Sequence, residues 1–416
     1  MPDQSISAGV TRTPTFDRRS VLRTAAAAGA LAVAGCDSPG ADDDPASVDD
    51  VDPDGPFQVS EVVSGLDAPW GIAFVPETSQ MLVTELPGRL QLVDREAGTT
   101  TELTGTPAVD TANQGGLLDV AVHPAFPSEP WIYLTYAASN DSGETATHLG
   151  RGRLALDGPE FSEFEQIHVA EPFVDSDAHY GSRVAFDSAG MLYMTAGDRQ
   201  FKNFGPDHVA QDLTNELGTT LRLDPDGSVP ADNPFVDDPE AADSIFTYGH
   251  RNPQGLDRHP ETGELWVSEH GENAGDEINR LGAGNNYGWP IADEGCEYGT
   301  EKPVAPDPQP GDGTTPPAYT WVCGEDRFPP GGMAFSDGEA FPDWQGDLFV
   351  GNLAGQYLGH LTVSDPAGAD PDLEEVDPLL AGNNWRVRDV AVAPDTGDLF
   401  VVIDSENAPL IRLYPE

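Results

Sequence analysis

Short hydrophobic runs separated by turn residues recur along the chain from residue 57 to its end. Each recurrence has a small residue, alternating apolar positions, a turn rich in Pro, Asp and Gly, and a second apolar run. This unit predicts two short β-strands joined by a turn, and no stretch between the units has sustained helical periodicity. Six copies occur: GIAFVPETSQMLVTE from Gly71, LLDVAVHPAFPSEPWIYLTY from Leu117, SRVAFDSAGMLYMTAGD from Ser182, QGLDRHPETGELWVSEHG from Gln254, GMAFSDGEAFPDWQGDLFVGN from Gly332 and RDVAVAPDTGDLFVVID from Arg388.

The spacing of the copies predicts the fold class. Successive copies begin about 45 to 80 residues apart, which leaves room for four strands per unit. A single unit cannot bury both of its faces, so neighbouring units must stack. We therefore expect an all-β protein in which residues 57–416 form one six-bladed β-propeller of four-stranded blades. An open array of β-sandwiches is the alternative.

The first 36 residues predict a targeting segment. Arg18 and Arg19 precede an apolar run, 25–35, that is too short to span a bilayer. Paired arginines are typical of the signal that exports folded proteins. The run ends in VAGC, which resembles a lipobox, so we expect a lipid anchor at Cys36 and an extracellular location on the cytoplasmic membrane. A buried Ala-rich helix is the alternative. Residues 37–56, rich in Asp, Pro, Gly and Ser, predict a flexible tether.

The charge balance excludes one class of partner. The chain has 72 acidic and 20 basic residues, for a formal charge of −52. Such a charge argues against nucleic acid as a partner. It can also indicate disorder, but 38% of the residues are hydrophobic and recur in strand-like runs. A folded protein adapted to high salt is the better interpretation, because the Debye length is roughly 3 Å at molar ionic strength.

Two cysteines remain after Cys36. Cys296 and Cys323 form an even pair, which in an exported protein predicts a disulfide. Two buried free thiols are the alternative.

Polar residues flank the paired strands of every copy. If the copies are equivalent, these flanking loops converge on one rim of the propeller, where function is commonly found. Before the first strand lie Pro69-Trp70, Gln114-Gly115-Gly116, His179-Tyr180-Gly181, Arg251-Asn252-Pro253-Gln254, Pro330-Gly331 and Arg386-Val387-Arg388. After the second strand lie Glu85, Tyr136, Asp198-Arg199, Glu269-His270, Asn352 and Asp404.

Arginines are concentrated in these loops. Five of the fourteen that follow Cys36 lie in or beside them: Arg183, Arg199, Arg251, Arg386 and Arg388. In so acidic a chain this predicts an anionic ligand, because the guanidinium group matches carboxylates and keeps its charge. Structural ion pairs with Asp198, Asp257 and Asp389 are the alternative.

At these residues the chain resembles the soluble quinoprotein aldose/glucose dehydrogenases, which hold pyrroloquinoline quinone (PQQ) on a six-bladed propeller. The resemblance covers roughly residues 57 to 414, and it rests on several phrases in order rather than on one. The phrases are QGGLLDVAVHP, HYGSRVAF, AQDLTNELGTTLRLDPDGSVPADNPF, YGHRNPQGL, HPETGELW, GDEINRLGAGNNYGWP and RVRDV.

The resemblance implies roles for individual residues. His179 matches the general base, and Arg251 matches a residue that stabilises charge on the quinone oxygen. The implied cofactor contacts are Gln114, Arg251, Asn252, Asn352, Arg386 and Arg388. A Ca²⁺ beside the quinone maps to the backbone carbonyls of Gly271 and Glu272, and a second, structural Ca²⁺ maps to Glu277 and Tyr287; such oxygen ligands suit Ca²⁺.

Two positions depart from the family pattern. Ala354 stands where many relatives have a lysine near the quinone, and Glu272 stands where relatives have proline. Neither departure affects His179.

The implied activity is the oxidation of an aldose to its lactone. The C1 hydroxyl would lose its proton to His179 while C1 delivers hydride to the quinone, and an external acceptor would take the electrons. Two other functions stay open: a non-enzymatic surface propeller that binds a glycan or protein, and a Ca²⁺-dependent lactonase that uses carboxylates such as Glu85, Glu269 and Asp404.

Overall fold

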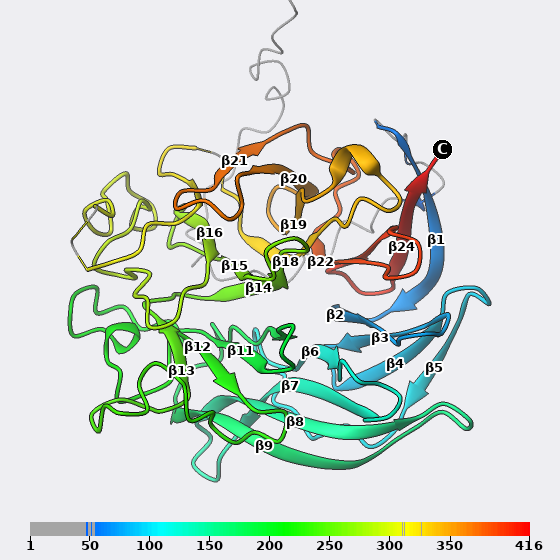
Figure 1. The fold of residues 1–416 in the computed structure, drawn as a ribbon, viewed down its shortest axis with the longest axis horizontal. Helices are drawn as coiled ribbons and strands as arrows, with labels where there is room; N and C mark the ends of the chain where they lie inside the picture. The colour runs from blue at the N-terminus through cyan, green and yellow to red at the C-terminus, as the bar shows by residue number, and fades with distance from the viewer. Residues whose placement is uncertain (1–46, 49–50, 52–54, 310, 312, 326) are drawn as a thin grey trace, which may run out of the picture. The chain divides into compact units, whose positions relative to one another are not determined.

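The computed structural model describes residues 47–48, 51, 55–309, 311, 313–325 and 327–416. In this part of the chain, 24 strands form six four-stranded antiparallel sheets, arranged as the blades of a β-propeller (Figure 1). Helical structure in the described residues is limited to short 3₁₀ turns such as η2 (Val209–Gln211) and η3 (Pro342–Trp344). The predicted six-bladed propeller is confirmed, and an open array is excluded.

Five blades consist of four strands that follow one another in the sequence. The predicted pair of strands is the first pair of every blade. Blade 1 contains β2 (Pro69–Phe74), β3 (Gln80–Glu85), β4 (Arg89–Asp94) and β5 (Thr99–Leu103). Blade 2 contains β6 (Leu117–Val122), β7 (Trp131–Ser139), β8 (Thr145–Ala155) and β9 (Glu160–Val174). Blade 3 contains β10 (Val184–Phe186), β11 (Leu192–Ala196), β12 (Thr219–Leu223) and β13 (Ile245–Tyr248). Blade 4 contains β14 (Pro253–Arg258), β15 (Leu265–Glu269), β16 (Asp276–Arg280) and β17 (Tyr319–Trp321). Blade 5 contains β18 (Pro330–Phe335), β19 (Leu348–Asn352), β20 (Tyr357–Ser364) and β21 (Asp372–Glu375).

The sixth blade closes the ring with strands from distant parts of the sequence. It contains β22 (Val387–Val392), β23 (Leu399–Ile403), β24 (Ala408–Pro415) and, as its outer strand, β1 (Phe57–Leu66). Strands β1 and β24 are antiparallel, with Phe57 opposite Pro415 and Leu66 opposite Ala408. This closure leaves the ring without an unpaired first or last blade.

The hydrophobic core lies mainly between blades. One cluster joins Leu82 of blade 1 to Leu134 of blade 2, and another joins Tyr133 of blade 2 to Met194 of blade 3. Because each interface has its own core, a domain of this size does not need a single large one.

Polar side chains fasten the inner strands of neighbouring blades. Hydroxyl groups on the second strands donate to carbonyls in, or just before, the next blade's first strand: Thr84 to Leu118, Thr135 to Ser182 (2.6 Å), Thr195 to Pro253 (3.0 Å) and Ser268 to Gly331 (3.2 Å). In alternate blades, an aspartate accepts a backbone N–H from the next blade: Asp119 from Val184 (2.9 Å), Asp257 from Phe335 (2.8 Å) and Asp389 from Ile72 (2.9 Å). These bonds fix the relative position of the inner strands, from which the candidate site is built.

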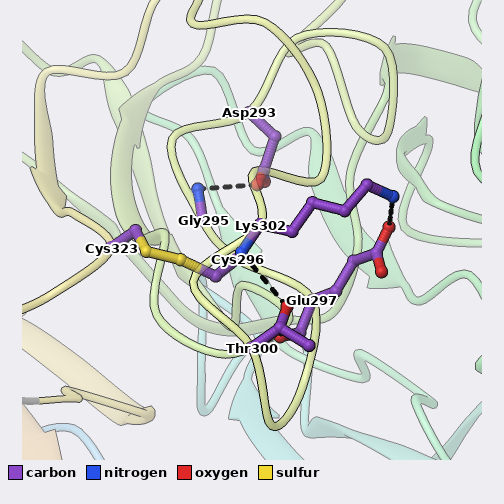
Figure 2. Close-up of a disulfide and its surroundings, with 7 residues drawn as sticks. All are labelled: Asp293, Gly295, Cys296, Glu297, Thr300, Lys302 and Cys323. Atoms are coloured by element: carbon purple, nitrogen blue, oxygen red, sulfur yellow. Dashed lines mark hydrogen bonds and ion pairs between the residues drawn. A yellow bond between two sulfur atoms is a disulfide. The ribbon is translucent and has the colours of Figure 1, made fainter.

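The two remaining cysteines form a disulfide, as predicted. Cys296 and Cys323 have Cα atoms 5.6 Å apart, and the bond ties the segment that contains Asp293 to the chain that follows β17 (Figure 2). Lys302 pairs with Glu297 in the same segment.

The predicted targeting segment, including Cys36, and most of the predicted tether lie outside the described residues. Within the described residues, no helix has the length and apolarity needed to span a membrane.

Candidate active site

The predicted site residues lie where the inner strands begin. The first strands of the six blades contact one another around the ring, so the segments that enter them are close in space. In five blades the pairing of first and second strands contains a register shift near this end. Such bulges redirect side chains and are common beside active sites.

Blade 3 departs furthest from regular strand geometry. Its first strand begins only at Val184, and the residues before it include His179 and Ser182 with φ angles of +50° and +86°. Left-handed backbone is uncommon for residues other than glycine and is concentrated at functional sites. The backbone N–H of His179 donates to Gln114 of blade 2 at 2.7 Å, which holds this conformation in place.

The imidazole of His179 is buried and hydrogen-bonded to Asp198. The distance from Nδ1 to Asp198 Oδ1 is 2.6 Å. Burial lowers the pKa of His179 to about 4, and the positive charge of Arg251 contributes to the same shift. The ring is therefore neutral near pH 7. In the described part of the chain, Nε2 has no hydrogen-bond partner.

Asp198 determines which ring nitrogen of His179 carries the proton. Burial favours protonation of this carboxyl, but the contacts with His179 and the charge of Arg251 outweigh it and lower the pKa of Asp198 to about 2. An ionised carboxylate can only accept hydrogen bonds, so Nδ1 must be the protonated nitrogen and Nε2 keeps its lone pair. Trp289 Nε1 donates to the other oxygen of Asp198 at 2.8 Å and fixes its orientation.

Arg251 lies on the same group of loops. Its backbone N–H donates to Glu269 (2.8 Å), and its guanidinium donates to the carbonyl of His270 (3.2 Å) and to Glu272 (2.8 Å). Its guanidinium carbon is 5.3 Å from the ring centroid of Trp289. The backbone carbonyl of Arg251 also accepts from the N–H of Asp198 at 2.7 Å, which joins blade 4 directly to the His179–Asp198 pair.

Asn252 completes this first group of residues. Its Oδ1 accepts from the N–H of Gly181 at 3.1 Å, two residues after His179. The structure therefore brings together Gln114, His179 and Asn252, which come from three different blades.

A second group of residues comes from blades 5 and 6. Arg386 and Arg388 both donate to Asp404, at 3.0 and 2.8 Å. Arg386 also donates to the carbonyl of Leu353, next to Asn352. Arg388 donates to Gln254 of blade 4 at 3.1 Å, which links this group to the first.

His270 bonds residues of blades 4 and 5: its backbone N–H donates to the carbonyl of Asn252 (3.2 Å), and its Nε2 is 2.7 Å from the carbonyl oxygen of Pro330. Burial lowers the pKa of His270 well below its usual range, and the charges of Arg251 and Arg388 and the ring of His179 act in the same direction. Hydrogen bonds link most of the predicted catalytic and cofactor residues, directly or through one intervening residue, whereas Asn352 is connected only through its neighbour Leu353.

Two of the five clustered arginines bond other residues of the fold. Arg183 forms ion pairs with Asp389 at 3.0 Å, a partner that the structural alternative named, and with Asp119 at 3.2 Å, which it did not. Arg199 donates to the carbonyls of Ala178 and Thr145, both at 2.9 Å. Because Ala178 precedes His179, Arg199 supports the segment that positions the imidazole.

Buried donors without partners are frequent among the predicted cofactor contacts, and Arg183 Nη2, His259 Nε2 and Trp266 Nε1 are also unpaired in the described residues. Among the described residues, five of the six predicted cofactor contacts have a buried side-chain nitrogen with no hydrogen-bond partner: Gln114 Nε2, Arg251 Nε, Asn252 Nδ2, Asn352 Nδ2 and Arg388 Nε. A buried donor without a partner is unfavourable by roughly 1–3 kcal/mol. Five such donors from four blades match a ligand rich in oxygen acceptors.

Acidic side chains line a small cavity beside Arg251. Glu269 and Glu277 are direct cross-strand neighbours, and both line this cavity with Asp293, Gly271 and Tyr287. Burial raises the pKa of Glu277 well above its usual range, and the charges of Glu269 and Asp293 raise it further. Burial likewise raises the pKa of Asp293 to about 7.

The cavity fits a hard cation in donor type and charge. Its oxygen donors are of the kind that Ca²⁺ prefers, and a cation would relieve the repulsion between Glu269 and Glu277. No group of three or more His, Cys, Asp or Glu side chains in the described residues is arranged to hold a metal on its own, so backbone carbonyls would have to contribute. The hydroxyl of Tyr287 is already bonded to the carbonyl of Arg280 and the N–H of Gly282.

Three functional side chains did not emerge as such from the sequence. Asp198 was expected only as a rim residue or an arginine partner, and spacing does not reveal that it pairs with His179. Trp289 belongs to the matched phrase NNYGWP without an expected role. Lys202, which pairs with Glu272 at 2.6 Å, is one of only two lysines, and this rarity was the one available signal.

The propeller, the oriented imidazole and the unpaired donors match a dehydrogenase of the quinoprotein sugar dehydrogenase class, and the comparisons with known proteins show this class. The aldose sugar dehydrogenase YliI of Escherichia coli is 35% identical over 350 residues, which cover 84% of this chain and 91% of that protein. The solved apo structure of the soluble aldose sugar dehydrogenase of Escherichia coli has a TM-score of 0.79 at 34% identity, and the match covers 86% of this chain and 100% of that chain.

More distant relatives agree. Quinoprotein glucose dehydrogenase B of Acinetobacter calcoaceticus is 26% identical, with 84% of this chain and 86% of that protein covered. The PQQ-bound structure of aldose sugar dehydrogenase from Streptomyces coelicolor has a TM-score of 0.68 at 27% identity, and the match covers 88% of this chain and 100% of that chain. The family model described as Glucose / Sorbosone dehydrogenase matches residues 66–412. The chain belongs to the glucose/sorbosone dehydrogenase family, and the predicted enzyme class is confirmed.

Proposed function

We propose that this protein oxidises the C1 hydroxyl of an aldose to the lactone with PQQ as the electron acceptor, and that Ca²⁺ assists. The observation that carries this proposal is the set of five unpaired buried donors beside an imidazole whose Nε2 is free to accept a proton. PQQ has carboxylate and carbonyl oxygens that match these donors, and relatives at 35% and 26% identity are named as an aldose sugar dehydrogenase and a quinoprotein glucose dehydrogenase.

The residues of this chain then have distinct roles. Bound PQQ would supply the hydride acceptor, and Ca²⁺ would supply a Lewis acid at Gly271 and Glu272, with a second ion at Glu277 and Tyr287. Nε2 of His179 accepts the proton of the C1 hydroxyl as the C1–H bond breaks, so that C1 becomes the lactone carbonyl. Asp198 holds the ring in the required tautomer and stabilises the imidazolium that forms. Arg251 stabilises the negative charge that develops beside it.

The lactonase alternative requires carboxylates from several blades to converge on one open site. Instead, Glu85 bonds Arg89 and Gln91, Glu269 bonds His250 and the Arg251 backbone, and Asp404 bonds Arg386 and Arg388. No observation favours a purely binding propeller.

We also propose that the mature protein begins at a lipidated Cys36 and acts outside the cell. The twin arginines and the lipobox-like VAGC support this, and the Cys296–Cys323 disulfide is consistent with an oxidising compartment. The excess of 52 negative charges supports a function in high salt.

Reconstitution tests the proposed function. The purified protein is given PQQ and Ca²⁺ in molar salt, and reduction of a dye acceptor is followed with a panel of aldoses. We expect sugar-dependent reduction that requires PQQ. Lactone hydrolysis without the quinone, or no reaction with any aldose, would contradict the proposal.

A further inference from the structure

The carboxylate of Glu272 lies between two cations. Its Oε2 is 2.8 Å from Arg251 Nη2 and 2.6 Å from Lys202 Nζ, and its Oε1 is 2.7 Å from Lys202 Nζ. Glu272 and Arg251 are buried, at 5% and 4% exposure, whereas 47% of the Lys202 side chain is exposed. The three groups therefore form a chain of ion pairs, which runs from the exposed ammonium of Lys202 through the carboxylate of Glu272 to the buried guanidinium of Arg251.

This chain of ion pairs joins loops of two blades. Lys202 lies in the loop that follows β11 of blade 3, and Glu272 lies in the loop that follows β15 of blade 4. The ammonium group is 5.7 Å from the ring centroid of Phe204 and 5.6 Å from that of Tyr298. Phe204 in turn contacts Trp289, which bonds Asp198. The ion pair is thus continuous with the His179–Asp198 pair.

Glu272 accepts only some of the hydrogen bonds that the guanidinium of Arg251 can donate. The guanidinium uses Nη1 for the carbonyl of His270 and Nη2 for Glu272, while its Nε is buried without a partner. An anionic or electron-rich ligand that bonds Arg251 must approach within a few ångströms of the Glu272 carboxylate. In a buried site, two like charges at that separation oppose each other strongly.

Resting on the function proposed above, we propose that Glu272 is an internal anion that competes with the quinone for Arg251. Lys202 sets the strength of this competition. Because it already bonds both oxygens of Glu272, Lys202 can neutralise the carboxylate when the quinone engages Arg251. The pair therefore determines how tightly this enzyme holds its cofactor.

Two variants should change quinone affinity in opposite directions. PQQ is titrated into the protein at saturating Ca²⁺ and fixed salt without sugar, and binding is followed by quenching of tryptophan fluorescence. Glu272→Gln should tighten the Kd by about tenfold or more, because the competing charge is removed and the backbone carbonyl remains. Lys202→Met should weaken it by about threefold or more, because the carboxylate then interacts with Arg251 alone.

The double variant tests whether Lys202 acts through Glu272. In the Glu272→Gln background, Lys202→Met should have no further effect, since the charge that Lys202 neutralises is gone. The chain's other lysine–glutamate pair provides matched controls of equal change in net charge (Figure 2). Glu297→Gln and Lys302→Met should leave the Kd within about twofold of the parent protein.

Three other results would each refute a stated claim, and a fourth would support the competition. If the parent protein binds PQQ and Glu272→Gln binds it no more tightly, the competition is refuted while the proposed function stands. If Lys202→Met weakens binding equally in both backgrounds, Lys202 does not act through Glu272. If no variant binds PQQ, the proposed function fails together with this inference. Binding that appears only in Glu272→Gln would support the competition directly.

Discussion

His179 and Asp198 form a buried hydrogen bond of 2.6 Å, with 5% and 1% of their side chains exposed. The bond joins the segment that precedes the first strand of blade 3 to the loop that follows its second strand. Both segments leave regular strand geometry at this point, and both contain residues with positive φ, His179 at +50° and Arg199 at +55°. The backbone of blade 3 is therefore shaped to bring an imidazole and a carboxylate together, and three predictions follow from their pairing.

Replacing His179 should abolish sugar oxidation without abolishing quinone binding. In His179→Ala the proposed proton acceptor is missing, so kcat should fall by about 10² to 10⁴-fold. The measurement is steady-state dye reduction together with PQQ titration. His123→Gln, which changes a half-buried histidine outside the site, should retain full activity. Turnover in His179→Ala close to that of the parent enzyme would remove the imidazole from the mechanism.

Replacing Asp198 by asparagine should impair His179 through its tautomer. An amide can donate to Nδ1, which would move the ring proton to Nε2 and block its role as acceptor. We expect kcat to fall by at least about 10²-fold with little change in the Kd for PQQ. Loss of the carboxylate charge should also move the acidic limb of the pH profile to lower pH. Equal damage from Asp198→Asn in the His179→Ala background would show that Asp198 acts independently of the ring.

The pH dependence of kcat/KM should have an acidic limb near the pKa of His179. Burial and the charge of Arg251 lower this pKa to about 4, so the base is free above that pH and protonated below it. Activity should therefore be flat near neutrality and fall tenfold per pH unit below about 4. A limb near 6.5, the ordinary value for histidine, would show that the ring is solvated in the working enzyme.

The repeat pattern allowed the fold to be predicted because each blade repeats the same local rule. Its first two strands alternate small and apolar residues around a Pro, Asp or Gly turn, and this pattern survives in all six copies. The closing strand β1 could not be predicted in the same way. It is paired with β24 more than 340 residues later, and only the shared need to cover an edge connects the two segments.

The candidate site was predictable as a set of residues but not as a set of bonds. Gln114, His179 and Asn252 could be placed at equivalent positions of successive repeats. The partners of the arginines could not, because a guanidinium in a loop can reach several carboxylates. Arg183 and Arg199 look equivalent to Arg251 in the sequence, yet the structure uses them inside the fold.

Calcium should stabilise the protein more at high pH than at low pH. The calcium-free folded protein holds the Asp293 proton until about pH 7, whereas the unfolded chain releases it near 3.8. The folded state thus binds more protons across this interval, and its free energy of unfolding decreases as the pH rises. Added Ca²⁺ should remove this loss, and the rise in Tm should be larger at pH 8 than at pH 5.

The variant Glu277→Gln tests whether the stabilising calcium ion binds in this cavity. It removes one of two opposed buried carboxylates, so the calcium-free protein should become more stable at pH 8 and respond less to added Ca²⁺. Glu297→Gln, whose carboxylate pairs with Lys302, is the control. An undiminished calcium response in Glu277→Gln would place the stabilising ion elsewhere.

The ring of inner strands should be intolerant of a single methyl group at Gly332. A Cβ atom at this position would lie 1.6 Å from Asp389 Oδ1 and 2.7 Å from Arg183 Nη2, so the ion pair that fastens blade 6 to blade 3 must move. We expect Gly332→Ala to lower the free energy of unfolding by about 2 kcal/mol or more. Gly158→Ala, where nothing lies within 4 Å of the added atom, should change it by less than about 0.5 kcal/mol.

In Asp389→Ala the obstructing carboxylate is absent, so adding Gly332→Ala to this variant should lower the free energy of unfolding much less than Gly332→Ala does alone. Additive losses in the double variant would mean that the clash with Asp389 is not the cause. Another close contact of Gly332 would then be the reason that glycine is required at this position.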